Sequence, residues 1–296
     1  TEDGYRMYYI SWNPCIGEGH LGIKWNVIES KDGLTWERPA LDIYDAPELE
    51  TNNVVLDNVE DNMFVFCDTN PACPPEERYK AIGREAPIKE KPELWCYVSP
   101  DGYHFKRSHL VTKSGYFDTL NTAFYKDGKY YCYIRSFHNF VEGEIATRDI
   151  RVLYSEDFRT WSEPTELKYS DDLDYDMYTN NVMPYERAPH ILIGMPTRYV
   201  RRHGWTKNVE QMNSYAHKKR IESSIDLRTA LHTTDAIFMC SRDSVNWTRF
   251  NEALLTPGYE TENNWVYGDC YLTYNPVDSG AENYWVYSLD NSRGLN

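Results

Sequence analysis

Hydrophobic and polar residues alternate in short runs along most of the chain, and clusters of Asp, Asn, Ser and Gly separate the runs. This period of two predicts β-strands joined by turns. The clearest β-branched or aromatic runs are Met63–Phe66, Lys129–Ile134, His190–Ile193 and Tyr284–Tyr287. Ahead of these lie candidate first strands at Asn52–Leu56, Phe117–Tyr125, Met177–Tyr185 and Tyr267–Tyr274. The pattern predicts an all-β protein in which each pair of runs forms neighbouring strands.

One short sequence recurs four times and marks where strands turn. Each copy reads Ser, any residue, Asp, three further residues and an aromatic residue, and the copies begin at Ser30, Ser99, Ser155 and Ser241. Ser and Asp side chains accept hydrogen bonds from nearby backbone N–H groups, so each copy predicts a turn between two strands. The distances between the copies are typical of one four-stranded propeller blade each, with loops of different length.

Counting these units along the chain predicts a five-bladed β-propeller of four-stranded antiparallel blades, as a single domain over residues 1–296. The first and last blades lack strands at the two ends of the sequence. The stretch that breaks the β pattern is 201–231, and its segment 208–220 fits a short helix inserted into the fourth blade. In a propeller the first strand of each blade lines the central channel, so polar residues in those strands are candidates for function.

The composition narrows the classes of partner. Lys and Arg number 31 against 46 Asp and Glu, giving a net charge of −15, which repels nucleic acids and anionic membrane surfaces. No run approaches the roughly 20 apolar residues of a membrane helix, so we expect a water-soluble chain without a membrane partner. Residues 1–10 lack the features of a secretory signal. Localisation stays open between secreted or periplasmic, if an upstream signal was removed, and cytoplasmic, and oligomeric state is open too.

Cysteine and histidine give little sign of cofactor chemistry. The 7 Cys cannot all pair, and we expect reduced thiols, with Cys67 and Cys73 as the most favourable disulfide pair because they flank one turn. The 8 His show no metal-ligand spacing. The run at 171–178 holds four Asp but lacks the Gly and distal Glu of a calcium loop. The sequence therefore predicts no cofactor and no metal, and a structural calcium ion has no support.

The segment Phe117–Arg135 (FDTLNTAFYKDGKYYCYIR) carries a family resemblance. It resembles the start of the third blade in the five-bladed glycoside hydrolases of families 43 and 32, where an Asp opens a strand followed by a DGKYY-type hairpin. The Ser-x-Asp-Gly-x-x-Trp turns resemble the blade turns of the same group. The resemblance implies a glycosidase with carboxylates in its channel, because cleaving an acetal needs a proton donor and a second carboxylate.

The resemblance also implies which carboxylates are catalytic. Asp118 matches the Asp that orients its neighbours in the third blade, and Asp176 is the candidate for the fourth-blade acid, with Asp174 the weaker alternative. Asp269 lies in the presumed inner strand of the fifth blade, where a buried acid is costly unless it is paired or used.

The family's first-blade carboxylate would fall ahead of Thr1, which leaves three alternatives. That carboxylate lies upstream of this sequence, or a channel carboxylate such as Asp269 or Glu50 replaces it, or the protein does not hydrolyse its ligand. The signature runs of family 32 are not found, since Arg148 and Asp149 are followed by Ile150 rather than Pro.

Polar and aromatic residues near the presumed inner strands are the candidate sugar contacts. Amides hydrogen-bond to hydroxyls, guanidinium groups hold carboxylates, and rings stack on sugar faces. These candidates are Asn52, Asn53, Asn121, Arg135, Tyr178, Arg198 and Trp265. Each also has a structural alternative, which is a satisfied strand amide for Asn, an ion pair for Arg and core packing for the rings.

Two functions compete on this basis. The first is a glycoside hydrolase that acts in polysaccharide degradation on a poly- or oligosaccharide, with Asp118, Asp176 and Asp269 as catalytic carboxylates. The alternative is a non-catalytic propeller that binds carbohydrate or another protein. A six-bladed sialidase is disfavoured, because the repeated turn is one residue shorter than the sialidase box and no arginine triad is evident.

Overall fold

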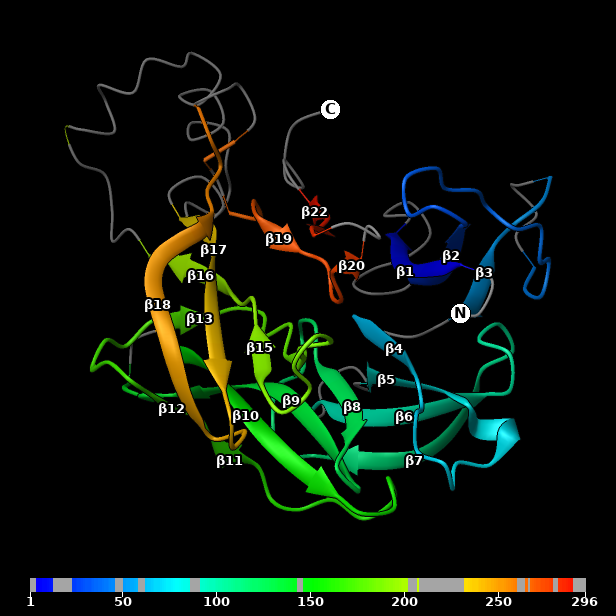
Figure 1. Ribbon diagram of the computed structural model, residues 1–296, viewed down its shortest axis with the longest axis horizontal. Coiled ribbons are helices and arrows are strands. Elements are labelled where there is room, and N and C mark those ends of the chain that lie inside the picture. Colours follow the sequence, from blue (N-terminus) through cyan, green and yellow to red (C-terminus); the bar gives the residue numbers. More distant parts are fainter. Residues whose placement is uncertain are drawn as a thin grey trace. The chain divides into compact units, whose positions relative to one another are not determined.

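The computed structural model describes residues 4–12, 23–45, 50–57, 62–85, 91–142, 146–201, 207, 232–259, 264–265, 267–278 and 282–289. Their regular structure is almost entirely strand, with one short 3-10 helix, η1 (Pro75–Glu77) (Figure 1). The predicted all-β class is therefore confirmed. Within these ranges no helix is long and apolar enough to cross a membrane. The helical insertion predicted within 201–231 falls almost wholly outside the described residues.

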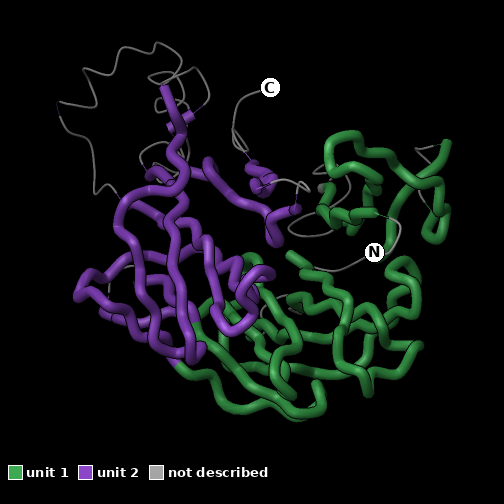
Figure 2. Tube along the Cα trace, in the orientation of Figure 1, with its two compact units in different colours: residues 1–136, 151–165 green, residues 137–150, 166–296 purple. Residues whose placement is uncertain are grey.

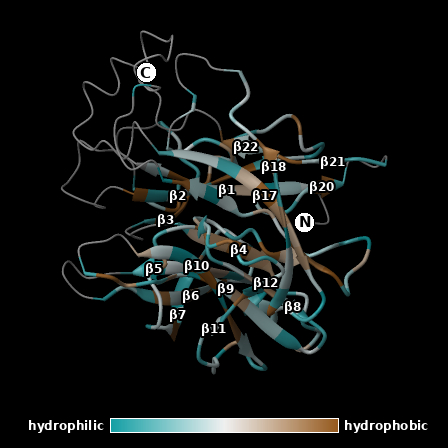
Figure 3. Ribbon diagram, turned by 90° about the vertical axis from the view of Figure 1, so that its left-hand side faces the viewer, coloured by the Kyte–Doolittle hydropathy of each residue, from teal (hydrophilic) through white to brown (hydrophobic). Residues whose placement is uncertain are grey.

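The chain divides into two compact units, coloured separately in Figure 2. Unit 1 comprises residues 1–136 and 151–165, and unit 2 comprises residues 137–150 and 166–296. Hydrophobic positions, brown in Figure 3, lie mainly on strands such as β2, β4 and β9. Buried side chains from several strands form a separate core cluster in each unit. The cluster in unit 1 includes Trp25, Val27, Val55, Met63, Ala81 and Tyr97, and the cluster in unit 2 includes Met183, Met195, Ala236 and Leu272.

Unit 1 contains a three-stranded and a four-stranded sheet. The first has the order β1 (Tyr5–Trp12), β2 (Ile23–Ser30), β3 (Val54–Asp57), and the second has the order β4 (Met63–Cys67), β5 (Tyr79–Glu85), β6 (Glu93–Ser99), β7 (Lys106–Thr112). The prediction that Asn52–Leu56 and Met63–Phe66 are neighbouring strands is wrong, because β3 pairs with β2 and β4 starts the next sheet. Alternation identifies a strand but carries no information about its hydrogen-bonding partner.

A third sheet has the order β11 (Thr165–Glu166), β10 (Thr147–Ser155), β9 (Lys129–His138), β8 (Thr122–Lys126). The sequence predicts that β8 and β9 are neighbouring strands, and this is confirmed. They pair antiparallel from Thr122↔Tyr133 to Lys126↔Lys129. Asp127 and Gly128 form the two-residue turn with φ of 50° and 82°. Two successive positive φ angles match the twist of a tight hairpin, which explains the Asp-Gly sequence there.

Unit 2 is built around a larger sheet that combines two long strands with several strands of two to four residues. Its main path is β12 (Lys168–Tyr169), β18 (Asn246–Leu255), β17 (Thr233–Ser241), β15 (Leu192–Gly194), β14 (Met183–Pro184), and β16 (Thr197–Val200) joins β17 to β13 (Asp176–Met177). Two short antiparallel pairs follow. β20 (Val277–Asp278) pairs with β21 (Tyr284–Trp285), and β19 (Tyr271–Leu272) and β22 (Ser288–Leu289), which flank them in the sequence, pair with each other.

The strand predicted at Met177–Tyr185 is interrupted between β13 and β14. The hydroxyl of Thr179 accepts a hydrogen bond from the backbone N–H of Thr197 at 2.9 Å, in place of a backbone carbonyl. Asn181 then has a φ of 46°, which a strand does not allow. Local side-chain bonding therefore splits one predicted strand into two short ones.

All four predicted turns are confirmed by the same pair of contacts. In each copy the Ser hydroxyl donates to the Asp carboxylate, which accepts in turn from two backbone N–H groups of the turn. The Ser Oγ to Asp Oδ1 distances are 3.0 Å for Ser30–Asp32, 2.9 Å for Ser99–Asp101, 3.1 Å for Ser155–Asp157 and 3.3 Å for Ser241–Asp243. The hydrogen bonds from Thr35 and Leu34 lower the pKa of Asp32 to about 2.

Candidate functional site

Asp176, the first residue of β13, is held by two arginines in unit 2. Its side chain is only 8% exposed. Its Oδ1 accepts hydrogen bonds from the backbone N–H of Arg148 at 2.9 Å, from Arg148 Nη1 at 3.2 Å and from Arg201 Nη2 at 2.6 Å. Arg201 Nε lies 2.6 Å from Oδ2. Burying a carboxylate is costly unless it is paired, and here two guanidinium groups balance its charge and fix its position.

The two arginines come from strand ends that the fold brings together. Arg148 is the second residue of β10, and Arg201 directly follows β16, whose Tyr199 pairs with Asp176 in the antiparallel register. Arg201 also donates to the carbonyl oxygen of Ala146 at 2.6 Å. This arginine therefore ties the start of β10 to the start of β13.

An aromatic cluster adjoins this ion cluster. The ring of Tyr178 is stacked with Tyr271 at a centroid distance of 5.7 Å and with Tyr199 at 6.0 Å, and its hydroxyl contacts the hydroxyl of Tyr267. The guanidinium of Arg148 lies 4.4 Å from the centroid of the Tyr199 ring. Arg148 thus joins the predicted residues Asp176 and Tyr178 in one cluster.

Arg148 also lines a cavity of about 240 Å³ in unit 2. Much of its lining is charged, and includes His138, Asp149, Glu166, Asp171, Asp174 and Arg249. Arg249 is bound to Asp171, with Nε 3.0 Å from Oδ2, and its guanidinium lies 4.2 Å from the centroid of the Tyr169 ring. The hydrogen bond from Arg249 lowers the pKa of Asp171.

His138 stands between two carboxylates of this cavity. Its Nδ1 lies 3.2 Å from Asp149 Oδ2, and its Nε2 lies 2.8 Å from Asp174 Oδ1. Asn139 Nδ2 donates to the other oxygen of Asp174 at 2.7 Å. The side chain of Asp149 is 5% exposed, whereas Asp174 is largely open to solvent. The ring is therefore fixed through both of its nitrogen atoms.

The sequence pattern does not identify His138, Arg148, Asp149 or Arg201 as members of a site. In the sequence, Arg148 and Asp149 are noted only because Ile150 follows them instead of Pro. In the structure, both residues are buried in β10. The signal that points to them is a charged pair just ahead of the buried residues Ile150, Val152 and Leu153 of the same strand.

In unit 1, Asp118 lies beside Arg135. Arg135 Nη1 is 3.0 Å from Asp118 Oδ1, and the Asp118 side chain is 42% exposed while that of Arg135 is 3% exposed. Phe117, just before it, has a φ of 56°, which is rare for a bulky residue. The predicted residues Asp118 and Arg135 are thus brought together, with Asp118 Oδ1 shielded beside the guanidinium and the rest of the side chain partly open to solvent.

The three predicted asparagines of unit 1 are buried, and their amides bond within the protein. Asn121 Nδ2 donates to the carbonyl oxygens of Phe117 at 3.0 Å and Thr119 at 2.8 Å, and its Oδ1 accepts from the backbone N–H of Arg135. Asn52 Nδ2 donates to the carbonyl oxygen of Tyr44, and Asn53 Nδ2 to that of Val27. Asn121 therefore holds the loop that carries Asp118.

The other predicted residues of unit 2 lie outside the cluster of Asp176, Arg148 and Arg201. Arg198 is paired with Asp235, with Nε 2.9 Å from Oδ1 and Nη2 2.6 Å from Oδ2, and this hydrogen bonding raises the pKa of Arg198. Asp269 is buried, and its carbonyl oxygen accepts from the Thr234 hydroxyl at 2.7 Å. Trp265 is half-buried, and its indole N–H donates to a carbonyl oxygen.

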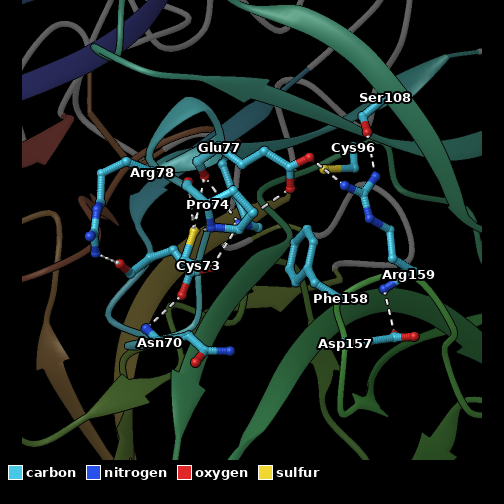
Figure 4. A network of polar contacts seen from close by, with 12 residues as sticks. Asn70, Cys73, Pro74, Glu77, Arg78, Cys96, Ser108, Asp157, Phe158 and Arg159 are labelled. Carbon is cyan, nitrogen blue, oxygen red and sulfur yellow. Dashed lines mark hydrogen bonds and ion pairs between the residues drawn. The ribbon is translucent and has the colours of Figure 1, made fainter.

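A further polar network lies in unit 1 (Figure 4). Lys80 Nζ is 2.7 Å from Asp68 Oδ2, both side chains are buried, and Lys80 also donates to Cys73 Sγ at 3.1 Å. Burial alone would lower the pKa of Lys80, but the hydrogen bonds and charges of Asp68 and Cys73 together outweigh it and the pKa is raised. The described cysteines are free thiols, as the sequence predicts, and this includes Cys67 and Cys73, the most favourable pair for a disulfide.

The same network continues to the surface of unit 1. Glu77 Oε2 lies 3.9 Å from Lys80 Nζ, and its other carboxylate oxygen accepts from Arg159, which also donates to Ser108 Oγ at 2.8 Å. These groups join η1 to the turn at 155–161. We interpret the network as structural, because each charge has an opposite partner within it.

Comparison with known proteins identifies the fold that carries this site. No protein-family model and no curated protein matches the sequence. Among solved structures, an N-acetylgalactosamine deacetylase from F. plautii in complex with blood group B trisaccharide is similar, with a TM-score of 0.51 and 13% identity over 86% of this chain and 67% of the other. A structure described as a GH130 glycoside hydrolase that targets β-1,2 mannosidic linkages in Candida mannan gives 0.51 and 12%, over 90% and 73%.

A third structure, the complex of BT0996 with RGII, has a TM-score of 0.51 and 13% identity over 88% of this chain and 73% of the other. This chain thus spans about two thirds to three quarters of the length of these three proteins. Identities this low bear on the fold alone. The chain has the fold of the propeller glycoside hydrolases, as the resemblance of Phe117–Arg135 predicts.

Proposed function

We propose that the protein is a glycoside hydrolase that cleaves the glycosidic bonds of a poly- or oligosaccharide by carboxylate acid–base catalysis. The observation that carries the proposal is Asp176, fixed by Arg148 and Arg201 at the start of a strand and beside an aromatic cluster and a polar cavity. The proposal also includes the number of blades and of domains. In it, the sheets are the blades of one five-bladed propeller over residues 1–296.

The contacts support different roles for the carboxylates. Asp176 already receives four polar contacts from two arginines, which suits a positioning residue rather than one that exchanges a proton. Asp118 has one guanidinium neighbour and an exposed oxygen, which suits a base or nucleophile. These roles differ from those that the family resemblance implies, in which Asp118 orients its neighbours and Asp176 is the acid. Asp269 is the remaining candidate for the acid.

The substrate contacts of the proposal are fewer than the sequence predicts. The amides of Asn52, Asn53 and Asn121 bond to protein atoms, and Arg198 is paired with Asp235. We therefore assign sugar contact to Trp265, whose ring suits a sugar face. The ring of Tyr178 is stacked with both Tyr199 and Tyr271, so we assign it mainly to packing within the aromatic cluster. Arg135 holds Asp118 in this scheme.

The test is hydrolysis of a panel of plant, microbial and marine glycans, with product release followed by chromatography. Asp118→Asn and Asp176→Asn keep the side-chain shape, and each should lower the rate by about 100-fold or more. Asp235→Asn is the matched control, because Asp235 also pairs with an arginine in unit 2 but outside the cluster. Circular dichroism and thermal unfolding establish that each variant is folded. Full activity of Asp118→Asn against a glycan that the wild type cleaves would contradict the proposal.

The alternative is a propeller that binds carbohydrate without cleaving it. Both carboxylate oxygens of Asp176 already contact arginines, which favours the binding function, since a positioning group serves binding as well as catalysis. Isothermal titration with the same glycans separates the two functions. Binding at micromolar concentration without any product over days would support the binding protein, and Asp176→Asn would then weaken binding while Asp118→Asn would not.

A further inference from the structure

Three residues that are far apart in the sequence meet in the cavity of unit 2. His138 ends β9, Asp149 is the third residue of β10 and Glu166 ends β11. One potential ligand atom of each lies within 4.8 Å of the other two. An imidazole nitrogen and two carboxylate oxygens are a common set of metal ligands in proteins.

The distance from His138 Nδ1 to Asp149 Oδ2 fits a shared cation. It is 3.2 Å, at the long end of the range for a hydrogen bond. Two ligands of a tetrahedral zinc ion, each about 2.0–2.2 Å from the metal, lie about 3.3–3.6 Å apart. The two atoms therefore lie close to the separation that one ion would impose.

The other nitrogen of the same ring is placed as a metal-bound histidine requires. A neutral imidazole has one N–H, so it can donate to only one of the two carboxylates that face it. With a cation at Nδ1, the proton stays on Nε2 and is donated to Asp174, 2.8 Å away. Asn139 holds the other oxygen of Asp174 at 2.7 Å. A carboxylate behind the metal-bound ring is the usual outer partner of such a site.

A buried hydroxyl in the same cavity lacks a partner in the part of the chain that the structure describes, which indicates room there for a water or another polar group. Tyr169 lines the same cavity, and its hydroxyl oxygen is shielded from solvent without a hydrogen-bond partner among the described residues. Burial raises the pKa of Tyr169, so the group is a neutral hydroxyl that needs an acceptor or a water. The cavity, of about 240 Å³, has room for an ion and its bound water.

We propose that His138, Asp149 and Glu166 bind a first-row divalent cation such as Zn²⁺ or Mn²⁺, with Asp174 positioning the His138 ring. The nitrogen ligand favours these ions over Ca²⁺ and Mg²⁺, which prefer oxygen ligands only. Three protein ligands leave a coordination position for water from the cavity. This metal site does not depend on the proposed glycoside hydrolase activity. No short sequence motif identifies this site, because its ligands come from three strands.

The experiment measures metal binding by the full chain. After removal of metal with a chelator, the protein is titrated with Zn²⁺, Mn²⁺ and Ca²⁺, and bound metal is counted by mass spectrometry; Co²⁺ absorption reports the ligand set. We expect one equivalent of Zn²⁺ or Mn²⁺ and no stoichiometric Ca²⁺. His138→Asn and Glu166→Gln should abolish this equivalent or weaken it at least tenfold, and Asp174→Asn should weaken it by about 10- to 100-fold.

His104→Asn is the matched control. His104 Nδ1 lies 2.7 Å from Asp101 Oδ2 in an exposed pair of unit 1, outside the three-ligand group. This variant should keep the full equivalent. Glu166 is exposed, so Glu166→Gln keeps the test valid even if His138→Asn does not fold. Absence of stoichiometric binding by the wild type, or equal binding by wild type and Glu166→Gln, would overturn the proposal.

Discussion

Arg201 contacts Asp176 at two points, with Nη2 donating to Oδ1 at 2.6 Å and Nε lying 2.6 Å from Oδ2. A planar guanidinium fixes the plane of the carboxylate as well as its position, whereas an ammonium group supplies only charge. The orientation of Asp176 beside the aromatic cluster therefore depends on Arg201, which contacts both carboxylate oxygens, whereas Arg148 contacts only Oδ1.

We predict that Arg201→Lys lowers kcat by about 10- to 100-fold while KM changes little, because a small misplacement of a positioned group costs that much. Arg198→Lys is the control, since Arg198 makes the same two-point contact with Asp235 outside the cluster. Steady-state kinetics on the cognate glycan measures both variants. Equal losses in the two would show that the effect is general to arginine pairs in this unit.

The sequence predicts well those features that depend on residues close together along the chain. The Ser and Asp of each turn bond to backbone groups a few residues away, and the Asp127-Gly128 hairpin depends on two backbone angles, so both follow from short segments. The partner of β3 and the arginines of Asp176 are set by contacts across tens of residues. The sequence singles out Asp176 itself, but nothing near Arg148, 28 positions earlier, indicates that it pairs with Asp176.

The buried pair of Lys80 and Asp68 predicts a large loss of stability when one partner is removed. Lys80→Met or Asp68→Asn leaves the other group without its opposite charge in the interior, which costs about 3–5 kcal/mol. Urea unfolding measures the loss. Arg187→Gln is the control, because Arg187 and Asp278 form an exposed pair at 3.5 Å, and its effect should stay within about 0.5 kcal/mol. A loss below about 1 kcal/mol for both core variants would show that water reaches the pair.

The turn aspartates predict loss of stability in acid. The pKa of Asp32 is lowered to about 2 by the backbone N–H groups of Thr35 and Leu34. The pKa of Asp101, Asp157 and Asp243 is lowered as well, by hydrogen bonds in their turns that outweigh burial.

A carboxylate whose pKa is lowered by folding contributes stability above its unfolded pKa of about 3.9, and that stability is lost as pH falls through the folded value. The melting temperature should therefore be nearly constant from pH 7 to 5 and fall between pH 4 and 2. Asp32→Asn should lower it at pH 6 and make the decline toward pH 2 shallower. An unchanged acid profile in this variant would contradict the assignment.

Tyr178 has near-parallel ring neighbours at 6.0 Å and 5.7 Å, in Tyr199 and Tyr271. A ring with two such neighbours contributes mainly to packing, so Tyr178→Ala should lower the free energy of unfolding by about 3–5 kcal/mol. Tyr178→Phe keeps the stack and loses only the contact with the Tyr267 hydroxyl, which should cost about 1 kcal/mol. Denaturant unfolding gives both values, and KM for the glycan is measured where each variant is folded. If Tyr178→Ala instead keeps its stability while KM rises about tenfold, the ring binds sugar directly, and Tyr199 and Tyr271 support it from behind.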